Sequence, residues 1–297
     1  ASDGTLLAEA LCPDCPSEAD DTMEFDGRVS RISQLYDIFM LNGEEIKADF
    51  DLLTAGRASR PLSASNRVIG NPDLIFLEEG AKAECAVFNT THGPIYLGRD
   101  SEVMEGSLIR GGFAMLDHAV VNMGAKIYGP TTLGPWCKVG GELNNVVMTG
   151  YSNKAHDGFL GNAVIGEWCN IGGGSTASNL KNDYTEIKLW NYAARRFLRT
   201  GLQFCGLIMG DHSKAGINTM FNTATVFGVG VNFHGSGYPR NFTASFQEGS
   251  TAGMSELPLS RFFATAERVM ARRGVPLTEA DRVIFAEIHE ITSQFKG

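Results

Sequence analysis

The side chains best suited to chemistry gather in one polar segment near the middle of the chain. The segment runs from Tyr151 to Asp157 and contains His156, and Glu142 lies fourteen residues before that histidine. In a coil of about eighteen residues per turn, such positions fall on successive turns and can be neighbours. A carboxylate beside a histidine fixes the imidazole tautomer and raises its basicity, as a general base working near neutral pH requires. The pattern therefore indicates proton transfer by His156, with Glu142 as its orienting carboxylate, and a surface histidine without a catalytic role is the alternative.

Metal chemistry has little support in the sequence. Cys12 and Cys15 form the one Cys-x-x-Cys, which alone supplies half a zinc site, and no second pair or histidine lies near it. We therefore expect no bound metal. Four further cysteines lie inside or beside repeat segments and are expected to be buried free thiols. They are Cys85, Cys137, Cys169 and Cys205.

The element that must position His156 is a repeat of six residues. Every sixth residue in one stretch is apolar, a period that fits neither a helix nor a half-buried strand. These residues are Leu97, Val103, Ile109, Met115, Val121, Ile127, Leu133 and Val139. A period of six fits a coil of short flat strands in which one inward side chain per strand stacks on its equivalent one turn below. The sequence therefore predicts the hexapeptide form of the parallel β-helix.

The hexads slip near Asn144 and Asn145. Beyond the slip they are expected to resume at Val147, Asn153, Phe159, Ile165, Ile171 and Ala177. A slip inside a solenoid must be absorbed by a loop or bulge, and such exceptions often carry function. This one lies between Glu142 and His156.

The chain divides into three expected parts. Residues 1–64 form a polar lead-in and a helical arm, residues 65–250 the β-helix domain, and residues 251–297 a helical cap over the open end of the coil. Between 181 and 203 the hexads stop. That stretch is expected to be an inserted, partly helical loop that packs against the coil or a neighbouring subunit, or contacts a ligand.

Helix signals occur at both ends of the chain. Apolar spacing predicts a helix over residues 30–41 that ends at Asn42–Gly43, and a second short helical or extended piece around residues 50–53. In the cap, Thr278 followed by Asp281 is a variant of the capping box that opens a helix.

Composition excludes several classes of protein. The 34 acidic and 25 basic residues give a net charge of −9, and no long run of Lys or Arg occurs, which argues against a nucleic-acid partner. Thirty-five glycines without low-complexity tracts favour repeated turns over disorder. No apolar stretch approaches the ~18 residues of a membrane span, and signal-peptide features are missing. We therefore expect a cytoplasmic protein with no membrane partner.

Two adjoining segments carry a resemblance to a known family. Residues 154–161 (KAHDGFLG) and 163–179 (AVIGEWCNIGGGSTASN) resemble the acetyltransferase half of the bifunctional N-acetylglucosamine-1-phosphate uridylyltransferase/glucosamine-1-phosphate acetyltransferase. Within the hexapeptide-repeat acyltransferases, the chain looks most similar to a subgroup of sugar nucleotidyltransferases that carry such a domain. The resemblance covers about residues 65–250. It implies a left-handed parallel β-helix, a homotrimer, and acetyl-coenzyme A bound as co-substrate in a groove between coils.

The resemblance also implies roles for individual residues. His156 falls on the catalytic histidine, which takes a proton from the sugar amine as the amine attacks the thioester, and Glu142 falls on its supporting carboxylate. Asn170 matches an asparagine that contacts the sugar. The side that binds coenzyme A is expected to include Gly173, Asn179, Leu180, Ile217 and Gly235.

The substrate side departs from the family pattern. Phe159 stands where the family has a sugar-contacting tyrosine, and Leu180 replaces another tyrosine. Asn144 replaces a phosphate-binding lysine, and no arginine is found around Tyr128 where the family has one. Phosphates are held largely by charge-assisted bonds, so these changes weaken recognition of a sugar 1-phosphate. The expected substrate-binding residues are Lys154, Asn144, Phe159, Asn170 and Tyr128, and the cations that could compensate are Lys126, Lys154, Arg195, Arg196 and Arg199.

The expected function is acyl-coenzyme A dependent N-acetylation of an amino sugar phosphate or sugar nucleotide, by the C-terminal part of a sugar nucleotidyltransferase-like protein. The Gly-rich, basic nucleotide-binding loop of the other half is missing here, so uridylyl transfer is not expected from this chain. One alternative is a non-catalytic module for trimerisation and sugar-nucleotide sensing. Another is a zinc enzyme of the γ-carbonic-anhydrase type, which shares the fold but needs two histidines five residues apart, a spacing that the six histidines do not contain.

Overall fold

The computed structural model describes Glu24, Gly27 and residues 29–296, and it divides the chain into two units, Ala1–Ser33 and Gln34–Gly297. The described residues of the first unit contain no helix or strand. The Cys12 and Cys15 pair lies outside the described residues. The fold below is that of the second unit.

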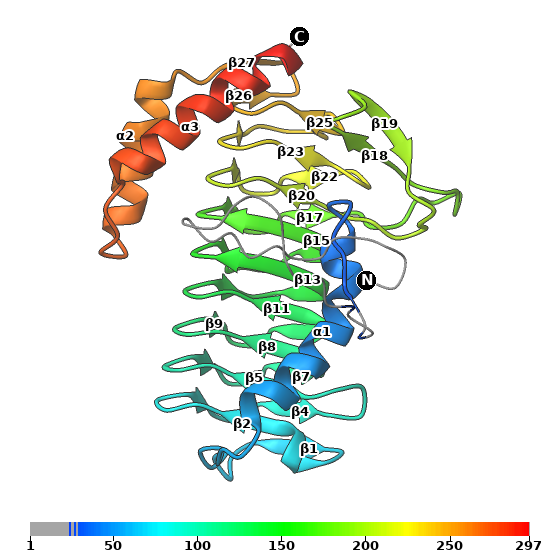
Figure 1. Cartoon of the computed structure of the whole chain (residues 1–297), viewed down its shortest axis with the longest axis vertical. Helices are drawn as coiled ribbons and strands as arrows, with labels where there is room; N and C mark the ends of the chain where they lie inside the picture. The colour runs from blue at the N-terminus through cyan, green and yellow to red at the C-terminus, as the bar shows by residue number, and fades with distance from the viewer. Residues whose placement is uncertain (1–23, 25–26, 28, 297) are drawn as a thin grey trace. The chain divides into compact units, whose positions relative to one another are not determined.

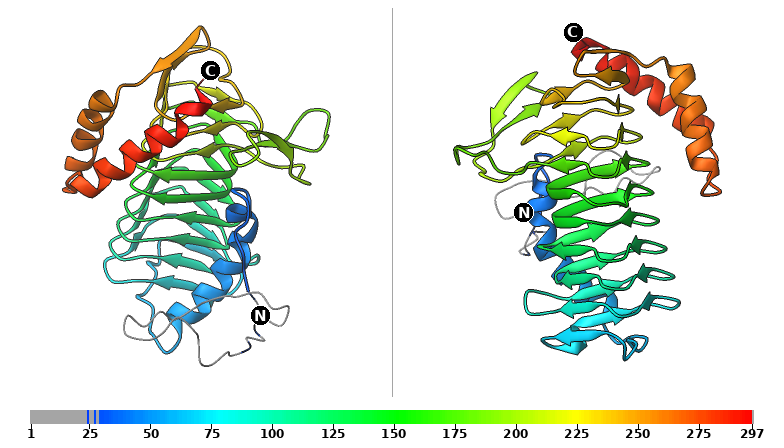
Figure 2. Two further views of the ribbon diagram at one scale, coloured as in Figure 1. Left: turned by 45° about the horizontal axis from the view of Figure 1, so that its top comes forward. Right: turned by 180° about the vertical axis from the view of Figure 1, so that it is seen from behind.

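The second unit is a parallel β-solenoid whose short strands pair from coil to coil along three faces (Figures 1 and 2). Face 1 consists of β2 (Ile75–Leu77), β5 (Ile95–Leu97), β8 (Phe113–Met115), β11 (Thr131–Leu133), the second halves of β13 (Glu142–Gly150) and β15 (Phe159–Glu167), β20 (Ile208–Met209), β23 (Val226–Phe227) and β25 (Phe242–Thr243). Face 2 consists of β3 (Lys82–Ala83), β6 (Glu102–Val103), β9 (Val120–Val121), β12 (Lys138–Val139), β14 (Asn153–Lys154), β16 (Asn170–Ile171), β21 (Lys214–Ala215), β24 (Asn232–Phe233) and β26 (Gln247–Ser250). Face 3 consists of β1 (Arg67–Ile69), β4 (Val87–Asn89), β7 (Leu108–Arg110), β10 (Lys126–Tyr128), the first halves of β13 and β15, β17 (Thr176–Ala177) and β22 (Met220–Phe221). The expected fold class, a left-handed parallel β-helix of hexapeptide repeats with a short N-terminal helical arm and C-terminal helices, is confirmed.

The predicted hexad residues form the core. All eight, from Leu97 to Val139, are at most 2% exposed. Paired residues of neighbouring coils lie eighteen positions apart, as in the pairs Leu108 with Lys126 and Val120 with Lys138. Each inward side chain therefore stacks on the one eighteen residues away, and burial of this column drives the coil to form.

The predicted slip is confirmed. Of the six positions expected after it, Ile165, Ile171 and Ala177 are buried in the core as predicted, but the first three differ from the expectation. Leu143 pairs with Ile127 and Met148 with Leu133, only sixteen and fifteen residues away. The corner between faces 3 and 1 is reduced to Asn145, which takes a positive φ of 57°, so that β13 runs through it as one strand. Because the shortened corners move the register by one residue, the inward side chains here belong to Met148, Lys154 and Leu160. Val147, Asn153 and Phe159 instead lie outside the core column.

The N-terminal helix differs from the prediction. It is a single helix, α1 (Asp37–Thr54), that continues through the expected stop at Asn42–Gly43 and takes in the second expected piece. The Asn42 side chain bonds to the Pro130 carbonyl (3.0 Å) and to the Thr132 hydroxyl (2.7 Å). A Cβ at Gly43 would come within 2.7 Å of Pro130, so the glycine permits close packing of the helix on the coil and does not end it.

The inserted loop is extended, not helical. Within 181–203, β18 (Lys188–Asn191) and β19 (Arg196–Arg199) form an antiparallel hairpin. Its buried residue Leu189 packs in the same apolar cluster as Phe39 of α1. Trp190 stacks on Phe242 of the solenoid with ring centroids 4.1 Å apart. The hairpin therefore packs against the coil, which was one of the two roles expected for it.

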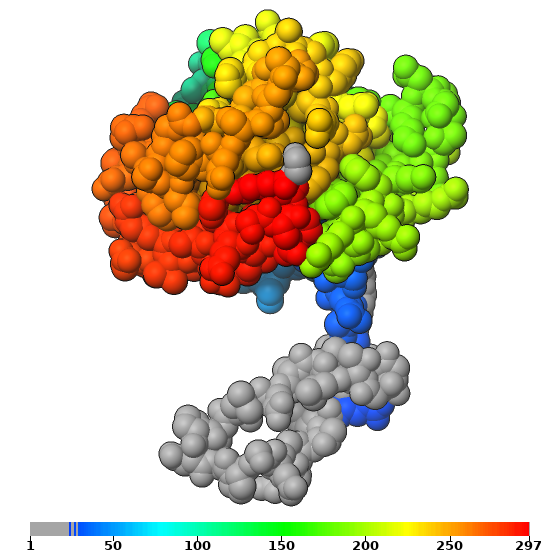
Figure 3. Space-filling view, turned by 90° about the horizontal axis from the view of Figure 1, so that it is seen from above, coloured from blue at the N-terminus to red at the C-terminus, as the bar shows by residue number. Residues whose placement is uncertain are grey.

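The C-terminal helices lie along the flank of the last coils and do not cover their open end (Figures 1 and 2). α2 (Leu259–Ala271) places Phe262 against Phe246 and His212, with ring distances of 5.0 and 5.5 Å. The predicted capping box of Thr278 and Asp281 is confirmed at the start of α3 (Glu279–Thr292). The remaining short elements are η1 (Pro72–Leu74), β27 (Gly253–Glu256), which pairs with β26, and η2 (Ser293–Phe295). Seen from above in Figure 3, the helices and the β18–β19 hairpin adjoin each other around the final coils.

Two further sequence expectations can be compared with the fold. Cys137, Cys169 and Cys205 are buried free thiols as expected, but Cys85, at a corner with a positive φ of 50°, is exposed. Within the described residues, no helix combines the length and the apolar character that a membrane crossing needs.

Candidate functional site

His156 lies at the corner between face 2 and face 3. The chain leaves β14 after Lys154 and enters β15 at Phe159. Gly158 completes the turn with a φ of +116°, and a Cβ there would come within 2.0 Å of a carbonyl oxygen in the next coil, so only glycine fits. His156 packs over Gly173, whose own Cβ position would be 3.2 Å from the Cβ of the histidine. The histidine is exposed, and no hydrogen bond to either ring nitrogen occurs among the described residues.

Lys154 holds this corner from inside the solenoid. Its side chain occupies an inward position above Val139 and is only 2% exposed. The ammonium donates a hydrogen bond to the carbonyl oxygen of His156. Burial lowers the pKa of Lys154 to about 8, although Asp157 acts in the opposite direction. In this position Lys154 supports the His156 backbone and does not reach the surface where a substrate would bind.

Glu142 does not contact His156 in this structure. The hydroxyl of Tyr128 donates a 2.5 Å hydrogen bond to the Glu142 carboxylate, and this bond raises the pKa of Tyr128 to about 12. The shortened coil places Glu142 at the start of β13 on face 3, paired with Phe159, whereas His156 stays at the corner. The structure therefore brings Glu142 and Tyr128 together and leaves the expected hydrogen bond between Glu142 and His156 unformed.

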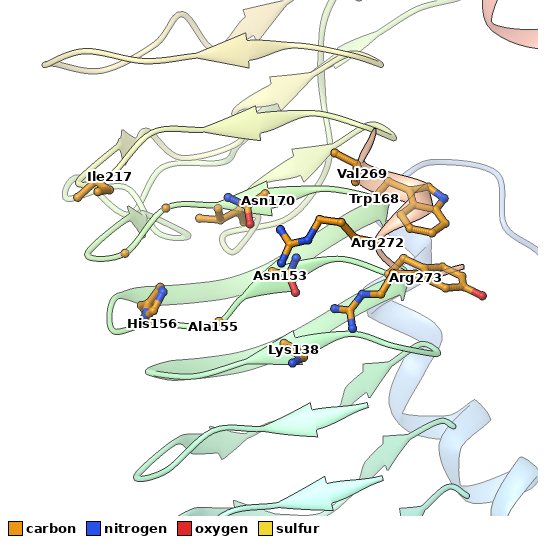
Figure 4. A pocket seen from close by; sticks show the side chains of 14 residues that line it. Lys138, Asn153, Ala155, His156, Trp168, Asn170, Ile217, Val269, Arg272 and Arg273 are labelled. Carbon is orange, nitrogen blue, oxygen red and sulfur yellow. The ribbon is translucent and has the colours of Figure 1, made fainter. Parts of the chain in front are cut away.

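A groove of about 710 Å³, named here the face-2 groove, lies on one side of the His156 corner (Figure 4). Strands β12, β14 and β16 form its floor, and the end of α2 forms the opposite wall. It contains four residues expected from the sequence, namely His156, Asn170, Gly173 and Ile217. It also contains three cations that the sequence did not single out, namely Lys138, Arg272 and Arg273. The two arginines precede Gly274 at a helix end, but no local pattern indicates that this helix returns to face 2.

A second cavity of about 1060 Å³, named here the face-3 pocket, lies on the other side of the corner. It contains the expected residues Phe159, Asn179 and Leu180. The Asn179 amide donates a 2.8 Å hydrogen bond to Asn162. Several other side chains of the lining are polar and uncharged, including Ser178, Asn182, Thr223 and Asn241.

Five of the expected site residues line neither cavity, namely Glu142, Tyr128, Lys154, Asn144 and Gly235. Asn144 lies on face 3 beside Gly129 of the previous coil. Gly235 lies near Ser250, on the same coil as Tyr238 and Asn241 of the face-3 pocket, but does not line that pocket. Among the described residues, no group of three or more His, Cys, Asp or Glu side chains is arranged to hold a metal ion.

Comparison with known proteins gives only distant similarity. No protein-family model and no curated protein matches the chain. Solved structures with some likeness include the acetyltransferase domain of PglB from Neisseria gonorrhoeae FA1090, at 10% identity and a TM-score of 0.17, over 73% of this chain and 67% of that one. They also include the polySia-specific acetyltransferase NeuO, at 10% identity and a TM-score of 0.20, over 64% of this chain and 70% of that one. Function must therefore be inferred from the residues of the two cavities.

Proposed function

We propose that this chain is an acyl-coenzyme A dependent N-acetyltransferase that acts on an amino sugar phosphate or a sugar nucleotide, with His156 as the general base. The observation that carries the proposal is the position of His156, which is exposed, lines the face-2 groove and lies at the corner that leads to Phe159 of the face-3 pocket. Two substrates that occupy the two cavities can meet at such a corner. The residues that resemble the hexapeptide-repeat acyltransferases lie around the same corner.

The chemistry requires a base at this point. A protonated amine has no lone pair, so His156 must accept the proton as the amine nitrogen bonds to the thioester carbonyl carbon. The carbon–sulfur bond then breaks and coenzyme A leaves as a thiolate, which can take the proton back from the imidazolium. In this proposal Asn170 contacts the sugar in the face-2 groove, and Asn179 and Leu180 line the side of the acyl donor.

We further propose a homotrimer. Two large apolar side chains at the corner that carries His156 are exposed, Met123 at 70% and Ile217 at 75%. Exposed apolar side chains grouped along one edge are typical of a contact between subunits. Analytical ultracentrifugation should give three times the chain mass of 32.1 kDa, and a monomer at micromolar concentration would contradict the trimer.

A thiol-release assay with acetyl-coenzyme A and a panel of amino sugars tests the enzyme directly. Loss of a general base costs about 10²- to 10⁴-fold in rate, and we expect such a loss in His156→Ala. The matched control is His92→Ala, which removes another exposed histidine from a distant loop near the start of the coil. Equal rates for the two variants, or no thiol release with any amino sugar, would rule out this function.

One observation favours a second candidate, a non-catalytic module for trimerisation and sugar-nucleotide sensing. The Glu142 carboxylate bonds to Tyr128 and leaves His156 without its expected partner. Isothermal titration calorimetry separates the candidates, because an acetyltransferase must bind coenzyme A. Tight binding of a sugar nucleotide together with no binding of coenzyme A would support the sensing module instead.

A further inference from the structure

The face-2 groove brings three cationic side chains together from opposite walls. Lys138 projects from β12, and Arg272 and Arg273 extend from the end of α2 toward the same strands (Figure 4). In that view the Arg272 guanidinium lies beside Asn153 and Asn170, and the Arg273 guanidinium lies beside Lys138. Three positive charges and two amides therefore border one cavity.

These three cations have no anionic partner among the residues that the structure describes. Across residues 29–296, no ion pair or side-chain hydrogen bond joins Lys138, Arg272 or Arg273 to another residue. By contrast, Arg57 and Arg199 pair with nearby glutamates. The chain has 34 acidic and only 25 basic residues, so partners of opposite charge are plentiful elsewhere. Gathered like charges repel each other, and binding of an anion relieves that repulsion.

The packing around Arg273 holds its guanidinium in place. The Cζ atom of Arg273 lies 5.4 Å from the ring centroid of Trp136, and His118 stacks on the same ring with centroids 4.3 Å apart. Near the start of α2, Phe262 packs against Phe246 of the solenoid and anchors the helix. A planar guanidinium already held over an aromatic ring loses less side-chain entropy when it binds an anion.

Stabilisation of the helix end does not explain the whole cluster. Arg272 is the C-cap residue of α2, and cations near a helix C-terminus interact favourably with its dipole. That effect accounts for Arg272 and Arg273. It does not account for Lys138, which comes from a strand of the solenoid, or for the open cavity between the strand and the helix.

We propose that Lys138, Arg272 and Arg273 form a phosphate-binding subsite in the face-2 groove, which holds the phosphate group of a substrate while its reacting end lies at His156. The subsite deepens the function proposed above and rests on it only for the choice of substrates. The guanidinium of an arginine can donate two parallel hydrogen bonds to two oxygens of a phosphate. Three cations together can neutralise an anion that carries more than one charge. Asn144 and Tyr128, where the resemblance places phosphate-binding residues, offer no cation.

Calorimetry with inorganic pyrophosphate at about 0.1 M salt tests the subsite on the full chain, since higher salt would screen the charges. We expect the double variant Arg272→Gln/Arg273→Gln to bind pyrophosphate at least about tenfold more weakly. Arg67→Gln/Arg110→Gln is the matched control, because it removes two charges that are unpaired among the described residues from exposed positions of β1 and β7, and it should bind as the wild type does. Equal affinities of the two double variants, or no binding by the wild type, would overturn the proposal.

Three single variants separate a binding effect from a folding effect. Lys138→Gln leaves α2 untouched and should also weaken pyrophosphate binding severalfold. Arg273→Lys keeps the charge but loses the planar fork, so it should bind pyrophosphate less tightly than the wild type and more tightly than Arg273→Gln. Equal binding by Arg273→Lys and Arg273→Gln would show that the charge of Arg273 does not act on the anion. Thermal unfolding of each variant confirms that the compared proteins are folded.

Paired ligands identify which substrate supplies the phosphate. Glucosamine 1-phosphate is compared with glucosamine for the acceptor, and coenzyme A with pantetheine for the donor. If Arg272→Gln/Arg273→Gln weakens the phosphorylated member of one pair alone, that substrate occupies the subsite. If it weakens neither phosphorylated ligand, the proposal is wrong. These are binding measurements, so failure of the thiol-release assay would remove the proposed function and leave the subsite intact.

Discussion

The coils from Leu97 to Val139 and the coils that follow them share one repeat and differ at their corners. In the first region the pairing is spaced by eighteen residues, and each inward hexad residue is apolar and buried. In the first turns after Val139 the spacing falls to between fifteen and seventeen residues, and Lys154 takes an inward position. The corners of the regular region line neither of the two cavities. The shortened region creates the His156 corner with the two cavities beside it.

This difference shows how a candidate functional site forms on a rigid scaffold. A close-packed column of apolar side chains gives a surface that repeats from coil to coil. Shortened corners break this repetition, and the backbone groups of the altered turn need new partners. The buried ammonium of Lys154 supplies one of them, at the cost of burying a charge in the core.

The largest expected effect on stability comes from a substitution that removes part of the regular column of inward side chains. Leu133→Ala should lower the free energy of unfolding by about 2 to 5 kcal/mol, because Leu133 is fully buried and its loss leaves a cavity. Leu108→Ala is the control, since Leu108 is 48% exposed on face 3, and it should cost less than about 0.5 kcal/mol. Denaturant unfolding measures both variants. A loss of acetyl transfer by folded Leu133→Ala would contradict the separation between scaffold and site.

A smaller and pH-dependent effect is expected from the shortened coil. Burial lowers the pKa of Lys154 from its ordinary 10.5 to about 8. Between these values the unfolded chain keeps the proton that the folded chain releases, so this lysine makes stability rise with pH from about 8 to 10.5. Below pH 8 the buried charge imposes its full penalty. Lys154→Met should therefore be more stable than the wild type by about 1 to 3 kcal/mol at pH 7, and this advantage should shrink toward pH 10.5.

Unfolding curves of the wild type and Lys154→Met over that pH range test the comparison. The difference between the two proteins isolates Lys154 from other buried groups, such as Lys214, whose pKa is also lowered by burial. We expect the methionine variant to acetylate more slowly at pH 7 although it is more stable, because the His156 corner loses its internal support. A constant stability difference across the range would show that Lys154 does not titrate in the core.

The repeat was predictable from sequence because its period is local. An inward apolar residue recurs every six positions from Leu97 to Val139, once on each successive face, and the slip appears as a break in that count. The register of the turn just after the slip was not predictable, although the predicted positions are correct again from Ile165. Lys154 looks like a surface residue by type, and only the one-residue shift of the shortened corners places it in the core.

The candidate site was predictable only in part, for the same physical reason. His156, Asn170 and Gly173 lie on successive coils and share one groove as expected. Arg272 and Arg273 join them across about a hundred residues of chain, through packing of α2 that no local pattern encodes. Asn42–Gly43 reads as a helix stop in isolation, but contact with Pro130 allows the helix to continue.

The smallest expected effect concerns Glu142, where the sequence and the structure disagree. The resemblance to the hexapeptide-repeat acyltransferases implies that this carboxylate is the partner of His156. In the structure it accepts a hydrogen bond from Tyr128 instead. If the structure holds during catalysis, Glu142→Gln should change kcat/KM in the thiol-release assay by less than about threefold, because an amide oxygen can still accept the tyrosine hydroxyl. Stability should change by less than about 1 kcal/mol. A loss of a hundredfold or more, with the acidic limb of the pH profile shifted, would show instead that Glu142 leaves Tyr128 and orients His156 when substrate is bound.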